Sequence, residues 1–409
     1  MKRLLIVLCA VCSLALFSCD NDGIATSTVS FYAKLPKSLS SKSPDFNGGT
    51  LTLTNVNTGI VTTEAMSSLA ISFPEVEDGL YNIMIEGSVK YESTDVEGNA
   101  VEKEETVRAL KENVEIVGGQ FDMNIELFLF KASNGFIISE IFFAGTETPE
   151  GKQYNEDKYI ELYNNSSEVL YADGLCIAES ELNTAMSLNE YTPDIRPNET
   201  PVSSVYRIPG TGQEHPVQPG ETILLCDVAI NHKEGNANSV DLSVADFEWF
   251  DGADVDVDVP ETPNMIKMVS TSASVWSLHN RGFSSYILFR MDDVTPEQFT
   301  TDYAYHYQYT FVWGDFVRVM EFDAWKVPND KILDAVECST PSDFEWKALD
   351  PSLDLSWTHS GDGDAARYGK SVKRKVAHTE DDGRKVLLDT NDSAFDFIAT
   401  AEPSPGEIE

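Results

Sequence analysis

The chain contains 409 residues, of which 42% are hydrophobic and 24% are charged, a mixture typical of a globular protein rather than a disordered one. Lysine and arginine total 29 against 68 aspartates and glutamates, giving a formal net charge of −39. So acidic a protein repels phosphate backbones, which disfavours any nucleic-acid partner. At ~100–200 residues per domain, two or three domains are expected.

The first residues predict export. Lys2 and Arg3 form a short basic start, and residues 4–17 form an almost purely apolar run. That run is shorter than the ~20 residues that a membrane-spanning helix needs, but it suits the core of a signal peptide over residues 1–18. The run ends in Leu-Phe-Ser-Cys at residues 16–19, which resembles a bacterial lipobox. The resemblance implies that Cys19 is lipidated and becomes the new N-terminus; the alternative is an ordinary secretory signal.

Residues 19–28 form a tether behind the lipid. The stretch Asp-Asn-Asp-Gly at residues 20–23 resembles the export signal of Bacteroidetes-type lipoproteins. This resemblance implies an outer-membrane, lipid-anchored protein that faces the cell exterior. No later run approaches ~20 apolar residues, so the lipid is the only membrane anchor that the sequence predicts.

A first β-sandwich is predicted over residues 29–130. Residues 29–35, 50–59 and 80–87 alternate between apolar and polar residues as strands do, and Asn, Asp and Gly mark the turns. Their order resembles prealbumin-like, carboxypeptidase-regulatory-like sandwiches, which implies a non-catalytic spacer. The highly charged stretch between Val89 and Glu115 fits either a helix or a long hairpin. Residues 131–135 are a polar linker.

The second domain is predicted over residues 136–409. Ile-Ser-Glu-Ile at 138–141, Tyr-Ile-Glu-Leu-Tyr-Asn at 159–164 and a hydrophobic–Asp-Gly–hydrophobic strand at 169–178 resemble, in this order, the lamin-tail domain. Pro-Gly-Glu at 219–221, Ser-Leu-His-Asn at 277–280, Gly-Lys-Ser-Val-Lys-Arg at 369–374 and Ser-Pro-Gly at 404–406 follow in family order. The resemblance implies an immunoglobulin-like β-sandwich, here enlarged by insertions at 179–216, 228–275 and 291–330.

The predicted fold class is therefore all-β, with two tandem β-sandwich domains. The combination of lipobox, prealbumin-like module and enlarged lamin-tail-like domain resembles an uncharacterised Bacteroidetes-type surface lipoprotein family, and that resemblance implies no known activity. One helical segment is expected in the third insertion, where Thr-Pro-Glu at 295–297 is typical of a helix start.

Past the lipid site only Cys176, Cys226 and Cys338 remain. An exported protein is permitted a disulfide, and three cysteines allow at most one. Beyond Cys19 the sequence has no CxxC or Cys/His cluster with metal-ligand spacing. Buried thiols are the favoured interpretation, and the disulfide state stays open.

An acidic run at residues 251–258 is the candidate metal site. In an extended strand Asp254, Asp256 and Asp258 would share one face, and Ca²⁺ would relieve the repulsion between their carboxylates. The favoured alternative is a solvated acidic loop. No other cofactor is predicted.

Two glutamates are the candidates for catalysis. Glu140 and Glu161 occupy matching positions in the first two strands of the second domain, and paired carboxylates can cleave glycosides at the right separation. They belong to the fold motif, however, so the favoured interpretation is structural. The six histidines form no HExxH or similar pair, so a zinc enzyme is not predicted. A triad assembled from distant residues stays open.

A tyrosine stripe is the candidate binding surface. Tyr303, Tyr305, Tyr307 and Tyr309 alternate with polar residues and are followed by Trp313. As a strand, this pattern places the four tyrosines on one face, where they either bind a ligand or pack on the sandwich core. The predicted function is a non-enzymatic one: binding of a nutrient, glycan or partner protein, as an accessory to an outer-membrane β-barrel transporter. The alternatives are a structural or adhesive surface protein and a carboxylate-dependent glycoside hydrolase.

Overall fold

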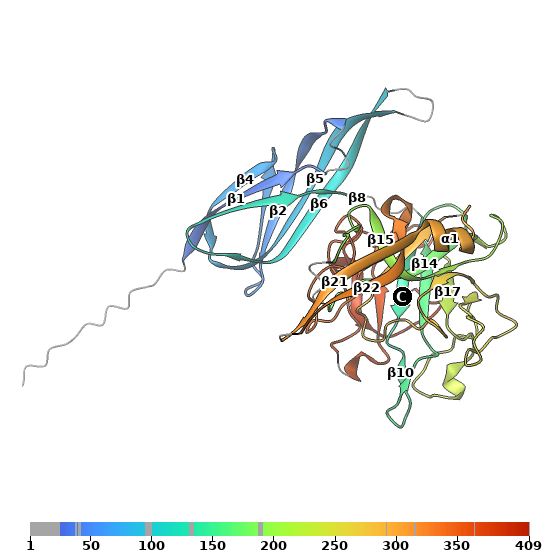
Figure 1. The fold of residues 1–409 in the computed structure, drawn as a ribbon. Coiled ribbons are helices and arrows are strands. Elements are labelled where there is room, and N and C mark those ends of the chain that lie inside the picture. Colours follow the sequence, from blue (N-terminus) through green and yellow to red (C-terminus); the bar gives the residue numbers. More distant parts are fainter. Residues whose placement is uncertain are drawn as a thin grey trace, which may run out of the picture.

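The computed structural model describes residues 25–408 except 37–38, 40–41, 95–99, 131–134, 187–190, 292, 315 and 364. Almost all regular structure in these residues is β, in several sheets, which confirms the predicted all-β sandwich class (Figure 1). The predicted signal peptide and Cys19 lie outside the described residues. Within the described part of the chain, no helix is long and apolar enough to cross a membrane.

The first eight strands form one β-sandwich. A three-stranded sheet in the order β4–β1–β7 lies against a five-stranded sheet in the order β3–β2–β5–β6–β8. β1 and β7 are parallel, and the other neighbours are antiparallel. The strands are β1 (Thr26–Lys34), β2 (Asp45–Asn55), β3 (Val61–Met66), β4 (Ala70–Glu77), β5 (Gly79–Thr94), β6 (Ala100–Ile116), β7 (Gln120–Glu126) and β8 (Phe128–Phe130).

The core of this sandwich follows the period of two in its strands. Leu51 and Leu53 of β2 are buried, as are Ile83 and Ile85 of β5, while the residues between them, Thr52 and Met84, are only half-buried. The charged stretch after Val89 is a long hairpin of β5 and β6 rather than a helix. Its cross-strand charges pair on the solvent side, so the high charge there stabilises a two-stranded ribbon.

The remaining strands form a second β-sandwich. One sheet has the order β18–β17–β12–β9–β24–β27, and the other has the order β21–β22–β15–β14–β20–β23, with β19 also paired to β15. The first sheet contains β9 (Phe136–Phe142), β12 (Tyr159–Asn164), β17 (Thr222–Cys226), β18 (Phe247–Glu248), β24 (Ser371–Arg374) and β27 (Phe397–Ala401). The second contains β14 (Leu175–Ser180), β15 (Glu199–Arg207), β19 (Ile266–Ser270), β20 (Tyr286–Arg290), β21 (Ala304–Trp313), β22 (Phe316–Pro328) and β23 (Ile332–Val336).

Short elements decorate these two sheets. The two-stranded ribbons are β10 (Thr146–Glu147) with β11 (Gln153–Tyr154), β13 (Leu170–Tyr171) with β16 (Pro216–Val217), and β25 (Val376–Thr379) with β26 (Lys385–Leu387). The helical segments are α1 (Pro296–Asp302), α2 (Ser393–Asp396), η2 (His232–Glu234), η3 (Asn329–Lys331) and η4 (Ala365–Arg367). α1 is the predicted helix, and Thr295 and Gln298 form a capping box at its start.

The six-stranded sheet is covered on both faces. Ile160 and Leu162 of β12 point into the main core, which also contains Leu175 and Ile177 of the opposite sheet. On the other face, Tyr159 packs with residues of the 228–275 insertion. β9 and β12 are therefore buried along their whole length, which a simple half-exposed strand would not be. Cys176, Cys226 and Cys338 are free and buried, as the favoured interpretation predicted.

Candidate functional site

The hairpin of β21 and β22 projects from the second sandwich. β21 is the edge strand of its sheet and pairs with β22 from Ala304 to Trp313. β22 in turn pairs with β15 only over its last residues, from Trp325 to Pro328. The rest of the hairpin therefore extends beyond the neighbouring strand, as Figure 1 shows. It belongs to the predicted 291–330 insertion.

The inner half of the tyrosine stripe lies in the core. Tyr305 and Tyr307 are 5% and 4% exposed and pack in a cluster with Tyr191 and Leu182. The Tyr305 hydroxyl donates to the carbonyl oxygen of Pro193 at 2.7 Å. The Tyr307 hydroxyl donates to a carboxylate oxygen of Glu181 at 2.8 Å. Tyr303 is not in the strand as predicted: it caps the end of α1, where it is half-buried and stacks on Phe299. The hydroxyls of Tyr305 and Tyr307 thus already form hydrogen bonds inside the protein.

The outer half of the same face is open to solvent. Tyr309 is half-buried and stacks on Phe322 with a ring-centroid distance of 5.8 Å. Phe311 and Phe316 meet edge to face and are 42% and 53% exposed. The Cα of Trp313 lies opposite that of Phe316 across the hairpin. The row of aromatic side chains on this face of the hairpin therefore begins in the core and continues into solvent.

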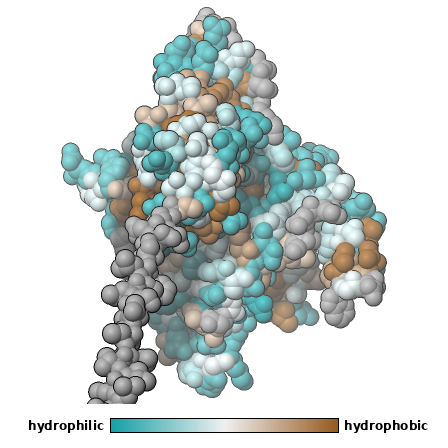
Figure 2. Space-filling model, turned by 90° about the vertical axis from the view of Figure 1, so that its left-hand side faces the viewer, coloured by the Kyte–Doolittle hydropathy of each residue, from teal (hydrophilic) through white to brown (hydrophobic). Residues whose placement is uncertain are grey.

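The opposite face of the hairpin tip is also apolar. Val312 and Val317 are cross-strand partners and are 61% and 63% exposed, and Val319 is 54% exposed. Figure 2 shows such hydrophobic areas gathered at a few places on an otherwise hydrophilic face of the molecule. Single exposed valines are ordinary, but a projecting strand pair that is apolar on both faces is typical of an interaction site. The outer end of the hairpin, residues 311–314 and 316–319, is called the hairpin tip below.

The paired glutamates of β9 and β12 are closed off from solvent. Glu140 and Glu161 are cross-strand neighbours, 1% and 0% exposed. Glu161 accepts hydrogen bonds from Ser139 Oγ at 2.8 Å and from the Gly406 backbone N–H at 2.6 Å. Glu140 accepts from the backbone N–H of Ser404 at 3.3 Å. The C-terminal Ser-Pro-Gly segment thus lies over both carboxylates and leaves no room for a sugar, which weakens the hydrolase alternative.

Burial also controls the protonation of this pair. Burial raises the pKa of Glu161 to about 8, against the lowering effect of the Ser139 and Gly406 hydrogen bonds, and the charge of Glu140 raises it further. Burial raises the pKa of Glu140 as well. Because two buried carboxylates side by side cannot both ionise without cost, one of them carries a proton near neutral pH. The pair therefore serves to fasten the C-terminal segment.

The acidic run at residues 251–258 is a loop with a turn at 254–255, not a strand. Asp256 accepts a hydrogen bond from the backbone N–H of Asp251, and Asp258 accepts one from the Asn264 amide at 2.8 Å. Asp254 is exposed. The common face that an extended strand would give these three carboxylates is absent here, and the calcium site stays a prediction from sequence.

Calcium should leave the thermal midpoint of this protein unchanged. Two of the three carboxylates already satisfy hydrogen-bond donors of their own loop, so a cation would have to break those bonds to bind. The measurement is thermal unfolding in millimolar Ca²⁺ and in chelator. A clear rise of the midpoint with Ca²⁺ that disappears in Asp254→Asn would contradict this expectation and restore the site.

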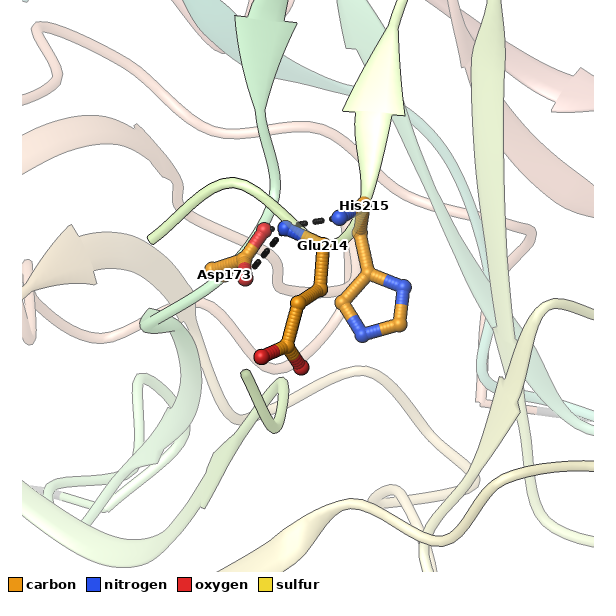
Figure 3. A group of neighbouring side chains, drawn as sticks. All are labelled: Asp173, Glu214 and His215. Atoms are coloured by element: carbon orange, nitrogen blue, oxygen red, sulfur yellow. Dashed lines mark hydrogen bonds between the residues drawn. The ribbon is translucent and has the colours of Figure 1, made fainter. Parts of the chain in front are cut away.

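One other group of potential ligands exists among the described residues. Candidate ligand atoms of Asp173, Glu214 and His215 all lie within 4.8 Å of one another. In Figure 3 the Asp173 carboxylate points at the backbone nitrogens of Glu214 and His215, while the side chains of these two residues point away from it. The three backbone donors to Asp173 are the N–H groups of residues 212, 214 and 215, at 2.9–3.0 Å.

Through these hydrogen bonds Asp173 fixes the conformation of the loop before β16. Burial raises its pKa, but the three backbone N–H donors outweigh burial and lower the pKa to about 2. Gly210 is required beside it, because a Cβ there would lie 2.2 Å from an Asp173 oxygen and its φ is +123°. Both Asp173 oxygens are thus engaged. The Asp-Gly pair in the lamin-tail-like strand marked this position in the sequence, but only as a turn.

A cavity of about 480 Å³ lies between the two sandwiches. The first sandwich contributes Glu126, Phe128 and Leu129, and the second contributes a wall that includes Ile332 and Leu353. Beside it, Arg108 donates a hydrogen bond to the carbonyl oxygen of Thr390 at 3.1 Å, which ties the two sandwiches together. None of the residues singled out from the sequence as binding or catalytic candidates lines this cavity.

Comparison with known proteins finds a similar family for part of the second sandwich. Residues 218–404 match the family described as "Protein of unknown function (DUF4876)". No curated protein matches the sequence. The crystal structure of a DUF4876 family protein from Bacteroides thetaiotaomicron VPI-5482 is similar with a TM-score of 0.56 and 22% identity, covering 92% of this chain and 96% of that chain. At that identity the likeness shows a shared fold. Residues 218–404 are thus similar to the DUF4876 family, and the hairpin of β21 and β22 lies inside this stretch.

Proposed function

We propose that this protein is a lipid-anchored outer-membrane protein that binds a partner protein at the cell surface through the hairpin tip. The observation that carries the proposal is the exposure of apolar side chains on both faces of a projecting strand pair. A partner that closes around the tip would remove Phe311, Phe316, Val312 and Val317 from water together. At ~25 cal/mol per Å² of apolar surface, such burial supplies a substantial driving force.

The chemistry of the tip favours a protein over a glycan. Sugars are held by hydrogen bonds together with aromatic stacking, and the two tyrosines with committed hydroxyls lie deep in the core. The phenylalanines and valines exposed at the tip offer no hydrogen bonds, which leaves Arg318, opposite Phe311, as the charged donor described there. The lipid predicted on Cys19 would hold the chain in the outer membrane, so a β-barrel of the same membrane is the partner class that we favour.

Pull-down of the lipidated protein in mild detergent tests this function. The test variant changes Phe316, Val317 and Val319 to threonine, which keeps strand propensity but removes exposed apolar surface. The control variant changes Ile60 and Val61 to threonine, because these side chains of the first sandwich are 60% and 59% exposed and lie outside the hairpin.

We expect a near-stoichiometric partner with the wild type and the control variant, and a loss of at least ~10-fold with the hairpin variant, since a few central apolar residues carry most of an interface's energy. Both variants should keep the wild-type thermal midpoint, because all five side chains are exposed. Equal recovery of the partner by the hairpin variant would refute the proposed docking site.

A further inference from the structure

Lys158 is a buried lysine that forms no ion pair with the residues that the structure describes. It precedes β12, and only 2% of it is exposed. Its Nζ donates a hydrogen bond to the carbonyl oxygen of Leu278 at 2.7 Å and lies 2.9 Å from Ser277 Oγ. Among the described residues, no carboxylate oxygen lies within salt-bridge distance, 4.0 Å, of this nitrogen. A buried ammonium without a carboxylate partner is costly, so this site favours the neutral amine.

Ser277 reaches solvent from a fixed backbone. The residue itself is exposed. The preceding Trp276 backbone N–H donates to Asp251 at 2.6 Å, and the His279 backbone N–H donates to Glu179 at 3.1 Å. Its hydroxyl is thus held over the lysine nitrogen on one side while the other side faces water. This is the arrangement in which an adjacent base activates a hydroxyl nucleophile.

Several charged groups face this lysine from the surrounding elements, and burial dominates over them. They are Glu179 of β14, Asp227 after β17, the adjacent Asp157, Arg367 of η4 and His279. Burial lowers the pKa of Lys158 to about 8, although the carboxylates raise it. Burial and neighbouring cations lower the pKa of His279 to about 4, so that this ring is neutral at pH 7. Near pH 8, about half of the protein molecules therefore carry Lys158 as the neutral amine.

We propose that Ser277 and Lys158 form a nucleophile–base dyad that cleaves carboxylic esters with small acyl groups. Ser277 Oγ bonds to the acyl carbon while its proton passes to the lone pair of Lys158 Nζ. The resulting ammonium returns that proton to the departing alkoxide, so that an alcohol leaves and an acyl-serine remains. Water then attacks the acyl carbon, gives one proton to Lys158 and releases the acid, while Nζ returns the proton to Ser277.

The open position of Ser277 sets the class of substrate. The residue lies on the surface, so it offers little binding energy to a long acyl chain, and a small acyl group on a good leaving group is the substrate that fits. The dyad lies outside the hairpin tip, between β12 and the segment before β20. Ester cleavage by the dyad would therefore be an activity beyond the proposed binding function. An experiment can refute either proposal without refuting the other.

Labelling with a fluorophosphonate tests the dyad in the folded protein. Ser277 Oγ would displace fluoride and form a stable adduct that peptide mapping locates. We expect the adduct on Ser277, with a rate that rises about tenfold per pH unit below pH 8 and levels off above it, as the lysine loses its proton. Hydrolysis of 4-nitrophenyl acetate should show the same profile.

The controls separate chemistry from folding. Ser277→Ala removes the hydroxyl that contacts Lys158 Nζ and should abolish both the adduct and ester hydrolysis while the protein stays folded, whereas Ser274→Ala, at an exposed serine nearby, should change neither. The pH profile of the wild type reports on Lys158 without a variant that would fail to fold. Equal labelling of several exposed serines, or a rate that keeps rising with hydroxide above pH 9, would overturn the dyad.

Discussion

Replacing Arg374 by methionine should destabilise the protein by about 3–5 kcal/mol, the range expected when one partner of a buried ion pair is removed. The Arg374 side chain is 1% exposed, and its Nη2 lies 2.6 Å from an Asp334 oxygen. Its Nη1 lies 3.4 Å from Asp389 and 3.6 Å from Asp396, both of them also buried. Methionine fills much of the volume but leaves three carboxylates without their cation.

Chemical denaturation at pH 8 and at pH 5 measures this effect. The loss should be larger at pH 8, because without the guanidinium these carboxyl groups must either ionise in the core or take up protons. Lys370→Met is the matched control, since its partner Glu402 is 79% exposed and such surface pairs contribute ~0–1 kcal/mol. A loss for Arg374→Met no greater than that for the control would contradict the assignment of Arg374 as the centre of this network.

Glu161→Gln should make the protein more stable at pH 8 while leaving its stability at pH 5 nearly unchanged. Burial raises the pKa of Glu161 from 4.5 in water to about 8. Between these values the folded state holds a proton that the unfolded state releases, so stability is greatest at low pH and falls as pH rises through this window. The slope is ~1.4 kcal/mol per pH unit for one such group.

Glutamine is neutral throughout this window and preserves the geometry. Its amide oxygen can accept from the Gly406 N–H, and its amide nitrogen can donate to Ser139 Oγ, in place of the two bonds of the glutamate. We expect a gain of ~3–5 kcal/mol at pH 8, seen as a shallower fall of the thermal midpoint with pH. Burial also raises the pKa of Asp227 to about 8 and of Asp354 to about 7. The Glu161→Gln variant should therefore keep part of the pH dependence of the wild type.

An unchanged pH dependence in Glu161→Gln would mean that this carboxylate is ionised and reaches water. That result would also return the pair of glutamates to the list of candidate catalytic groups, since an open, ionised Glu161 beside a protonated Glu140 is what glycoside cleavage needs.

The sequence predicted the positions of the strands better than it predicted the tertiary contacts that cover them. Alternation in β2, β5 and β12 located the strands and their apolar faces, because a period of two is a local property. The burial of Glu161 was not predictable in the same way, because the residues that cover it, 404–406, lie more than two hundred positions along the chain. The acidic 251–258 run favours a solvated loop, and the structure has a loop there, but no local pattern predicts that Asp256 closes a turn on Asp251.

The tyrosine stripe shows the same limit. Its alternation correctly placed Tyr305, Tyr307 and Tyr309 on one face of a strand. Where the core ends along that face depends on β15, which stops pairing with β22 at Trp325, and no local pattern reports such a tertiary boundary. The contact of Lys158 with Ser277 likewise joins residues 119 positions apart, so the sequence offered no signal for it.

Photo-crosslinking on intact cells tests the proposed function most directly. A photoreactive residue replaces Val317 in the hairpin tip in one variant and Val61 of β3 in the other, two positions that are 63% and 59% exposed. We expect one dominant protein adduct from position 317, of the size of an outer-membrane β-barrel, and none from position 61. The same adducts from both positions, or no protein adduct from position 317, would contradict docking through the hairpin.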